Sequence, residues 1–369
     1  MCCLCGISDY WNKSWVPTRY VQVHLLISRI LIVGLGSIGQ RHLRLAREII
    51  PEADIRVLRH QSGGSLPSGA NGCFSRLEEA IAFAPQIAVI SNPAPFHIDT
   101  AQALANEGVH LLVEKPLSDS LKGVEQLLAT CNEKGAVLLV GYNLRYLQSL
   151  QRFRDLLSDR LIGKVLSVRC EIGQYLPSWR PDSDYRLDVS ARHDLGGGAL
   201  LELSHELDYL RWIFGEVEWV TASLSRQSDL EIDVEDSAHL TLGFVPAFDG
   251  YRLIGTVNLD FIRHDTTRLC TAIGENGSLR WNGLTGEVAL FTANKGEWLQ
   301  EYSQQHLRDE SYLAEWQHFI ACVGKKELPN VAGDDGLKVL EIIEAARKSA
   351  LSTGRVQVAR TTKVCETNS

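Results

Sequence analysis

Three glycines with the spacing Gly34-x-Gly36-x-x-Gly39 directly follow the apolar run at residues 30–33. In this spacing the first glycine permits a tight turn, the second lets the backbone approach a pyrophosphate, and the third lets a helix pack closely on the strand. A helix that begins here directs free N–H groups and the positive end of its dipole at the phosphates. Between an apolar strand and an amphipathic helix, the motif predicts a site for a nicotinamide or flavin dinucleotide.

A lysine that could act on a substrate lies in the sequence Glu114-Lys115-Pro116. The proline disfavours a helical conformation at Lys115, so we expect this residue to be extended and its side chain to reach into a crevice. An ammonium group there would polarise a substrate oxygen or hold the nicotinamide ribose. A solvated surface lysine is the competing interpretation.

A histidine flanked by carboxylates follows the three glycines at 196–198. Glu202, His205 and Asp208 recur at intervals of three residues, which predicts that they lie along one helix. A histidine in such surroundings can donate or accept a proton near neutral pH. The same pattern also fits a hydrogen-bonded structural histidine.

The segment before residue 146 alternates apolar runs with helical patterns, which predicts an α/β domain with a parallel sheet covered on both faces. We assign residues 29–145 to a Rossmann dinucleotide-binding domain. Ligands bind at the carboxyl ends of such strands, so the loops that follow the strands should surround the site. Strands are expected at 30–33, 54–58, 86–91, 109–113 and 137–140, and helices at 98–108 and 119–134.

Residues 146–369 form a second, α+β domain in this interpretation, with roles in substrate binding and oligomerisation. Apolar and polar residues alternate with a period of two, which is typical of an open, mainly antiparallel sheet. We expect one face of this sheet to be too apolar to leave in water, and therefore a homodimer or homotetramer that assembles through residues after Val217. Strands are expected at 165–174, 217–226, 239–244, 252–261, 267–275 and 287–292, a hairpin turn at Glu275-Asn276-Gly277, and helices at 149–157 and 336–352.

The end of the second predicted strand indicates which nicotinamide cofactor is used. NAD enzymes usually carry an acidic residue there, which binds the adenosine ribose. Here Leu58 is followed by Arg59-His60-Gln61-Ser62. Arg59 could pair with a 2′-phosphate and Ser62 could donate to it, so NADP(H) is preferred and NAD(H) remains possible. Alternatively, Arg59 stacks on the adenine of either cofactor.

Composition excludes several other classes. The net charge of −8 argues against a nucleic-acid partner, and the apolar stretch before the glycines is interrupted by His24, Ser28 and Arg29, so no membrane span is expected. Nine cysteines, an odd number, favour reduced thiols and a cytoplasmic location. The group Cys2, Cys3 and Cys5 has no second ligand pair, so no metal site is predicted. Residues 1–28 are interpreted as a poorly ordered extension.

Five motifs in order, GLGSIGQRH, SNPAPFH, EKPLS, GYNLRY and GGGALLELSHELD, resemble the Gfo/Idh/MocA oxidoreductases across nearly the whole chain. The resemblance implies a catalytic role for Lys115 and for His205, which would relay the hydroxyl proton. It also implies that the segment with Asn143, Arg145 and Tyr146 approaches the substrate. The family pattern has an aspartate four residues before the histidine, where this chain has Leu201, and Glu202 could replace it.

The resemblance implies hydride transfer between NAD(P) and a sugar, cyclitol or related hydroxyl or carbonyl substrate. The L-E-L-S-H-E variant is similar to members associated with surface-sugar biosynthesis. Two alternatives stay open: a glycosidase of the same fold that retains NAD, and a non-catalytic dinucleotide sensor. We expect the substrate to contact Asn143, Arg145, Tyr146, Glu202 and Asp208, and the cofactor to contact Gly34, Gly36, Ser37, Ile38, Gly39, Arg59, His60, Ser62, Asn92, Pro93, His97, Glu114 and Lys115.

Overall fold

The short apolar runs of the first third of the chain form a six-stranded parallel sheet in the computed structural model, which describes residues 27–59, 65–246, 250–305, 307–325 and 327–359. The predicted extension at 1–28 lies almost wholly outside the described residues, as do His60 and Ser62. The strand order is β3-β2-β1-β4-β5-β6, with every pair parallel. Helices cover both faces of the sheet, which explains why its central strands are apolar throughout. The strands are β1 (Arg29–Val33), β2 (Asp54–Leu58), β3 (Gly72–Phe74), β4 (Ile87–Ile90), β5 (His110–Val113) and β6 (Leu138–Val140).

Four helices lie between these strands: α2 (Ser37–Ile49), α3 (Leu77–Ala82), α4 (His97–Asn106) and α5 (Val124–Lys134). The predicted start of α5 at residue 119 is wrong. Gly123 directly precedes the helix with a φ of +76°, a left-handed conformation that cannot continue a helix from earlier residues.

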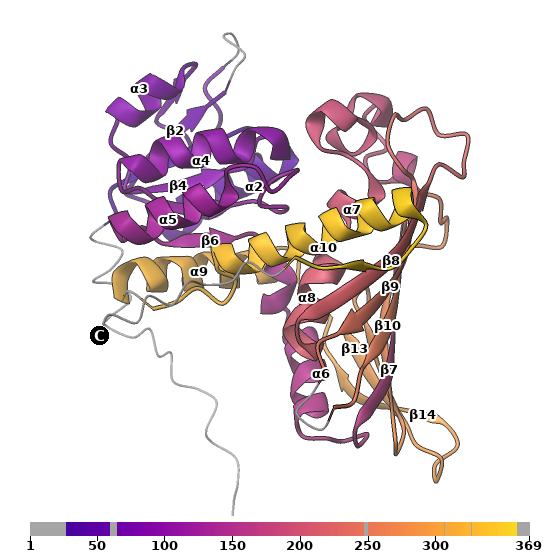
Figure 1. The fold of residues 1–369 in the computed structure, drawn as a ribbon. Coiled ribbons are helices and arrows are strands. Elements are labelled where there is room, and N and C mark those ends of the chain that lie inside the picture. The colour runs from indigo at the N-terminus through magenta and orange to yellow at the C-terminus, as the bar shows by residue number, and fades with distance from the viewer. Residues whose placement is uncertain (1–26, 60–64, 247–249, 306, 326, 360–369) are drawn as a thin grey trace, which may run out of the picture.

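A helix that the sequence analysis did not predict also packs against the six-stranded sheet. Helix α9 (Glu310–Lys325) follows the second sheet in the chain, yet it packs on the first one (Figure 1). Its Trp316, Phe319 and Ile320 are buried in one apolar cluster with Ile30 and Ile32 of β1. The core of the first sheet is therefore built from two distant parts of the chain.

The second sheet has nine strands in the order β14-β13-β12-β11-β7-β10-β9-β8-β15. Only β7 and β10 pair in parallel, and the other pairs are antiparallel, as expected for an open, mainly antiparallel sheet. The predicted hairpin turn at residues 275–277 joins β11 to β12. The strands are β7 (Val165–Gly173), β8 (Val217–Ser225), β9 (Ser237–Phe244), β10 (Ile254–Asp260), β11 (Thr267–Gly274), β12 (Ser278–Asn282), β13 (Glu287–Phe291), β14 (Trp298–Ser303) and β15 (Val356–Gln357).

Helices α6 (Gln148–Ser158), α8 (His205–Phe214) and α10 (Gly333–Ser352) lie on one side of this sheet, and its other side is open (Figure 1). Along β10, Val257 and Leu259 are buried while Thr256 and Asn258 are exposed. The exposed positions of neighbouring strands include Arg169, Thr221 and His239. The expectation of an apolar open face is therefore wrong: the period-two pattern located the buried face, which the chain's own helices cover, but the open face is largely polar.

Helix α7 (Ala199–Glu202) and six single turns of 3₁₀ helix complete the described secondary structure. The 3₁₀ turns are Ala94–Phe96, Asn143–Tyr146, Leu176–Ser178, Tyr185–Leu187, Val189–Ala191 and His193–Leu195.

Candidate active site

A cavity of about 900 Å³ lies at the carboxyl ends of β1, β2, β4 and β5. One wall consists of residues 33–38, 91–94 and 114–116 of the first domain, and the other includes residues 187–190 of the second. A volume of this size is typical of pockets for small ligands and cofactors. The carboxyl edge of the sheet is also where ligands bind in open α/β folds.

The glycine motif shapes this cavity as a phosphate cradle. Gly34 has a φ of +86°, and a Cβ atom there would lie 2.7 Å from the backbone nitrogen of Asn92. A Cβ on Gly39 would lie 2.2 Å from the carbonyl oxygen of Gly34, so this glycine permits the close helix–strand contact. Gly36 lines the cavity, and nothing lies within 4 Å of its Cβ position. Helix α2 starts at the next residue with no acidic side chain in its first turn, so its free N–H groups suit a diphosphate.

Most residues expected to bind the cofactor line this cavity. Gly39 does not, because it is packed between α2 and the preceding strand. The lining residues among those predicted are Gly34, Gly36, Ser37, Ile38, Arg59, Asn92, Pro93, His97, Glu114 and Lys115, together with Glu202 from the substrate set.

His97 touches the cavity but acts mainly as a link between two loops. Its Nε2 lies 2.6 Å from the carbonyl oxygen of Asn92, and its Nδ1 lies 3.0 Å from that of Pro116. Burial lowers the pKa of His97, although the two carbonyl groups oppose this effect. A neutral ring carries a single N–H group, so it donates to one carbonyl at a time.

Lys115 reaches from the first domain to the second. Its Nζ donates to the carbonyl oxygen of Glu202 at 2.9 Å and lies 3.8 Å from the Glu202 carboxylate. Both side chains are largely buried, with exposed fractions of 18% and 17%. This contact bridges the cavity where the two domains meet.

The predicted single helix through Glu202, His205 and Asp208 is wrong. Helix α7 (Ala199–Glu202) ends at Glu202, and α8 begins at His205. Between them the backbone bond from Ser204 N–H goes to Leu201, three residues back, which tightens the turn and interrupts the regular helix.

His205 is therefore the first residue of α8, and its ring lies 5.6 Å from that of Tyr142. Within the described part of the chain, its Nδ1 is buried and has no hydrogen-bond partner. Burial and the positive charges of Lys115 and Arg268 lower the pKa of His205 well below 6.5. The imidazole is thus neutral at physiological pH and can accept a proton.

His205 is not among the residues that line the cavity, and the remaining predicted substrate residues lie outside it as well. Arg145 forms a buried two-point ion pair with Asp208, with nitrogen–oxygen distances of 2.5 and 2.9 Å. Asn143 donates to Ser311 at 2.8 Å, and the ring of Tyr146 packs 5.8 Å from that of His318. These side chains tie the first turn after β6 to α8 and α9.

Residues outside the predicted sets of catalytic, substrate and cofactor residues also line the cavity. Arg41 lies over the ring of Tyr312, 4.6 Å from its centroid, and both face the cavity. On the opposite wall Arg180 forms a 2.9 Å ion pair with Asp188. Arg41 could have been found from its place two residues after the glycine motif. Tyr312 gave no signal, because the helix that carries it was missed.

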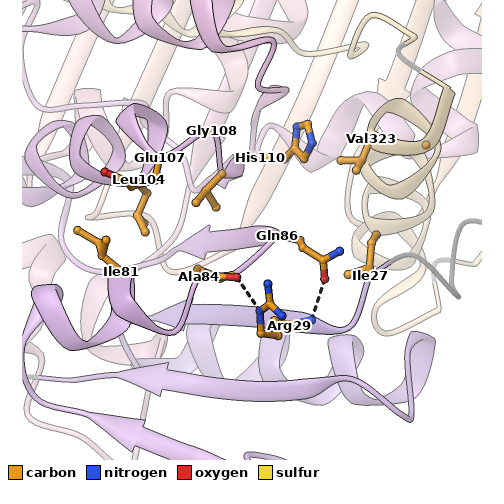
Figure 2. Close-up of a pocket in the computed structure, with 13 residues that line it drawn as sticks. Ile27, Arg29, Ile81, Ala84, Gln86, Leu104, Glu107, Gly108, His110 and Val323 are labelled. Atoms are coloured by element: carbon orange, nitrogen blue, oxygen red, sulfur yellow. Dashed lines mark hydrogen bonds between the residues drawn. The ribbon is translucent and has the colours of Figure 1, made fainter.

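A second cavity, of about 460 Å³, lies at the opposite, amino edge of the same sheet (Figure 2). Arg29 Nε donates to the carbonyl oxygen of Ala84 at 2.7 Å. Gln86 Oε1 accepts from the backbone N–H groups of Ser28 and Arg29 at 2.7 and 3.1 Å. The Arg29 and Gln86 side chains of this second cavity are thus already hydrogen-bonded to nearby backbone groups.

Among the described residues, no group of three or more His, Cys, Asp or Glu side chains is arranged to hold a metal ion. The helices of the described segments include none that is long and apolar enough to cross a membrane.

Comparison with known proteins identifies the class. Residues 28–142 match the family model for the NAD-binding Rossmann fold of an oxidoreductase family, and residues 154–358 match its C-terminal alpha/beta domain. The chain belongs to this family, the Gfo/Idh/MocA oxidoreductases, as its motifs predicted.

Individual relatives are distant but span most of the chain. It is 26% identical to myo-inositol 2-dehydrogenase of Thermotoga maritima, over 87% of this chain and 96% of the relative. It is 25% identical to D-xylose 1-dehydrogenase (NADP(+)) 2 of Haloferax volcanii, over 72% and 78%. The fold superposes on levoglucosan dehydrogenase in complex with NADH with a TM-score of 0.78, at 21% identity and coverage of 90% and 99%.

Proposed function

We propose that this protein oxidises or reduces a sugar, cyclitol or related polyol with a nicotinamide dinucleotide. The observation that carries the proposal is the contact between Lys115 and Glu202, three residues before His205, at one cavity that also contains the phosphate cradle. The names of the relatives support a polyol substrate, since they include an inositol and a xylose dehydrogenase. A role in surface-sugar biosynthesis is the narrower form of this proposal.

The roles of the two residues follow from their charges. In the oxidation direction the neutral His205 accepts the hydroxyl proton, and the Lys115 ammonium stabilises the negative charge that develops on that oxygen. The bound nicotinamide supplies the chemistry that these side chains lack, because it accepts or donates the hydride. Glu202 holds the Lys115 ammonium at the cavity through its carbonyl oxygen.

The test is a turnover assay of the purified full chain with NADP⁺ or NAD⁺ and a panel of inositols, pentoses, hexoses and anhydrosugars. We expect reduced nicotinamide to form with at least one member, and the rate to depend on both Lys115 and His205. Tightly bound NAD that is never released, with glycoside cleavage and no net reduction, would favour the glycosidase instead. Cofactor binding without turnover of any polyol or glycoside would favour the sensor.

We also propose that NADP(H) is preferred over NAD(H). Arg59 lines the cavity at the end of β2, where its guanidinium can pair with a 2′-phosphate. No acidic residue directly follows this strand in the sequence. One relative uses NADP(+) by its name, whereas the superposed structure contains NADH, so the choice must be measured.

Assembly and compartment complete the proposal. We propose a homodimer or homotetramer that pairs through the open, largely polar face of the nine-stranded sheet, which the chain's own helices leave uncovered. Light scattering at micromolar concentration tests this, and a monomer would exclude it. The five described cysteines are all free thiols, which supports a cytoplasmic location.

A further inference from the structure

A chain of buried hydrogen bonds lies behind Lys115 and joins three segments that are far apart in the sequence. Trp316 Nε1 on α9 lies 2.9 Å from His42 Nδ1 on α2, and His42 Nε2 lies 2.8 Å from Glu114 Oε1. Glu114 Oε2 then accepts from the backbone N–H of Lys115 at 3.1 Å. The Trp316 and His42 side chains are fully buried, and Glu114 is 6% exposed.

The direction of these hydrogen bonds is fixed by chemistry. An indole nitrogen can only donate, so His42 Nδ1 must accept and cannot carry a proton. The single N–H group of the neutral ring then lies on Nε2, where it faces the Glu114 carboxylate. Trp316 thereby selects the histidine tautomer that donates to Glu114.

The surroundings keep Glu114 ionised. Burial alone would raise its pKa, but the hydrogen bond and electrostatic attraction of His42, together with the charge of Lys115, outweigh that effect, so the pKa of Glu114 lies below its ordinary value. Glu315 lies near it on α9, and neither of its carboxyl oxygens has a partner within the described residues. Burial and the charge of Glu114 raise the pKa of Glu315 well above its usual range, which favours its neutral form beside an ionised Glu114.

We propose that Trp316 and His42 are positioning residues for Lys115, and this inference rests on the role of Lys115 in the proposed function. Trp316 and His42 hold the Glu114 carboxylate in place through their hydrogen bonds. Glu114 in turn accepts from the backbone N–H of Lys115, and this fixes the position from which the lysine side chain reaches the carbonyl oxygen of Glu202. Trp316 on the missed helix α9 thus takes part in the site without lining the cavity.

A matched pair of variants separates positioning from ordinary packing. Trp316→Phe keeps an aromatic ring but removes the donor to His42. Trp281→Phe does the same in the second sheet, where the fully buried Trp281 donates to Ser149 at 2.9 Å. His42→Leu removes the donor to Glu114, whereas His42→Gln retains one. We expect both tryptophan variants to lose similar stability, because each loses one buried hydrogen bond.

Turnover should distinguish them. In Trp316→Phe and His42→Leu, kcat should fall by roughly 10- to 100-fold, since displacing a reacting group by about an ångström can have an effect of that order. In these two variants KM and the cofactor Kd should change little. Trp281→Phe should retain the wild-type kcat, and His42→Gln should have a kcat between those of His42→Leu and the wild type. An equal fall in kcat in the two tryptophan variants would overturn the proposal.

A second measurement does not depend on any substrate. Limited reductive methylation, followed by peptide mass spectrometry, gives the reactivity of Lys115 relative to Lys348, whose side chain is 63% exposed. We expect the relative reactivity to rise several-fold in Trp316→Phe and His42→Leu, because the Lys115 ammonium is no longer held at Glu202, and to stay at the wild-type level in Trp281→Phe. Wild-type reactivity of Lys115 in folded Trp316→Phe would overturn the positioning role. If no polyol is turned over but the reactivity changes as expected, the proposed function fails and the positioning role stands.

Discussion

The two edges of the first sheet carry cavities that differ in how their polar groups are satisfied. At the amino edge, Arg29 and Gln86 bond to the backbone around them, and His110 Nδ1 accepts from Val137 N–H at 2.9 Å. At the carboxyl edge, the first turn of α2 presents free N–H groups, and Asn92 Oδ1 is buried without a hydrogen-bond partner in the described structure.

The difference in unsatisfied polar groups favours the carboxyl-edge cavity as the binding site. A buried polar atom without a partner is unfavourable, so a native protein keeps one mainly where a ligand or water completes it. The amino-edge cavity is lined by groups that already stabilise the strand ends. The carboxyl-edge cavity has the groups that a dinucleotide and a polyol would satisfy.

The largest expected effect is at His205. His205→Ala should lower kcat by about two to four orders of magnitude, which is typical for removal of a general acid or base, and should leave the cofactor Kd nearly unchanged. His110→Ala at the amino edge is the matched control and should change stability alone. Single-turnover hydride transfer measures the difference. Wild-type rates in His205→Ala would show that this histidine is structural.

The pH dependence of His205 follows from its lowered pKa. Because the folded chain keeps this imidazole neutral well below pH 6.5, proton acceptance should persist as the pH falls through 6.5. The unfolded chain takes up a proton at His205 near pH 6.5 and the folded chain does not, so the free energy of unfolding should decrease as the pH falls below that value. Urea unfolding at several pH values should show a smaller decrease in His205→Ala. An unchanged decrease would mean that His205 titrates normally.

Lys115 should give the next largest effect. Lys115→Ala removes the ammonium that stabilises the reacting oxygen, so we expect kcat to fall by about 10²-fold or more and cofactor binding to weaken. Arg29→Ala also removes a cation, but at the amino edge, and should reduce stability by about 1 kcal/mol through its lost hydrogen bond. Steady-state kinetics and thermal unfolding separate the two. Equal kinetic effects would remove the distinction between the edges.

Two left-handed glycines sharpen the comparison further. Gly34 at the carboxyl edge and Gly108 at the amino edge have φ values of +86° and +74°. Alanine at either position costs about 1–2 kcal/mol of stability for the left-handed conformation. At Gly34 the new Cβ also collides with backbone 2.7 Å away, whereas at Gly108 nothing lies within 4 Å. Gly34→Ala should therefore be less stable than Gly108→Ala and bind cofactor more weakly, as fluorescence titration would show. Equal cofactor affinities would argue against the phosphate cradle.

The sequence predicted the parts of the fold that depend on local pattern. The run before Gly34 could only form a buried strand, and β2 has the bounds that its apolar residues predicted. Helix α9 was missed because its buried Trp316 and Phe319 pack against strands nearly three hundred residues earlier in the chain, so only the tertiary structure explains them.

For the candidate site, the residue types indicated which chemistry is possible, but the sequence did not predict how all of these residues are arranged. Lys115 lies at the cavity as its motif indicated, but Asp208 was grouped with His205 on spacing alone. Asp208 instead pairs with Arg145 in the interior. Spacing along a helix cannot reveal an interruption such as the one between Glu202 and His205, because the same spacing fits both a continuous and an interrupted helix. Glu202 accordingly contacts Lys115, and the described structure has no hydrogen bond between Glu202 and His205.

The smallest expected effect concerns the choice of cofactor at Arg59. We expect the wild type to bind NADPH more tightly than NADH by about tenfold, because a charge-assisted bond to phosphate contributes about 1.5–3 kcal/mol before solvent exposure weakens it. Arg59→Asp should reverse the preference, since its carboxylate repels a 2′-phosphate and can accept from the ribose hydroxyls. Arg252→Asp makes the same charge change in the loop before β10, where the Arg252 side chain is 61% exposed, and should leave the ratio unaltered. Fluorescence titration with both reduced cofactors gives the two dissociation constants. Equal constants in the wild type would exclude the NADP(H) preference and leave Arg59 as a residue that stacks on the adenine of either cofactor.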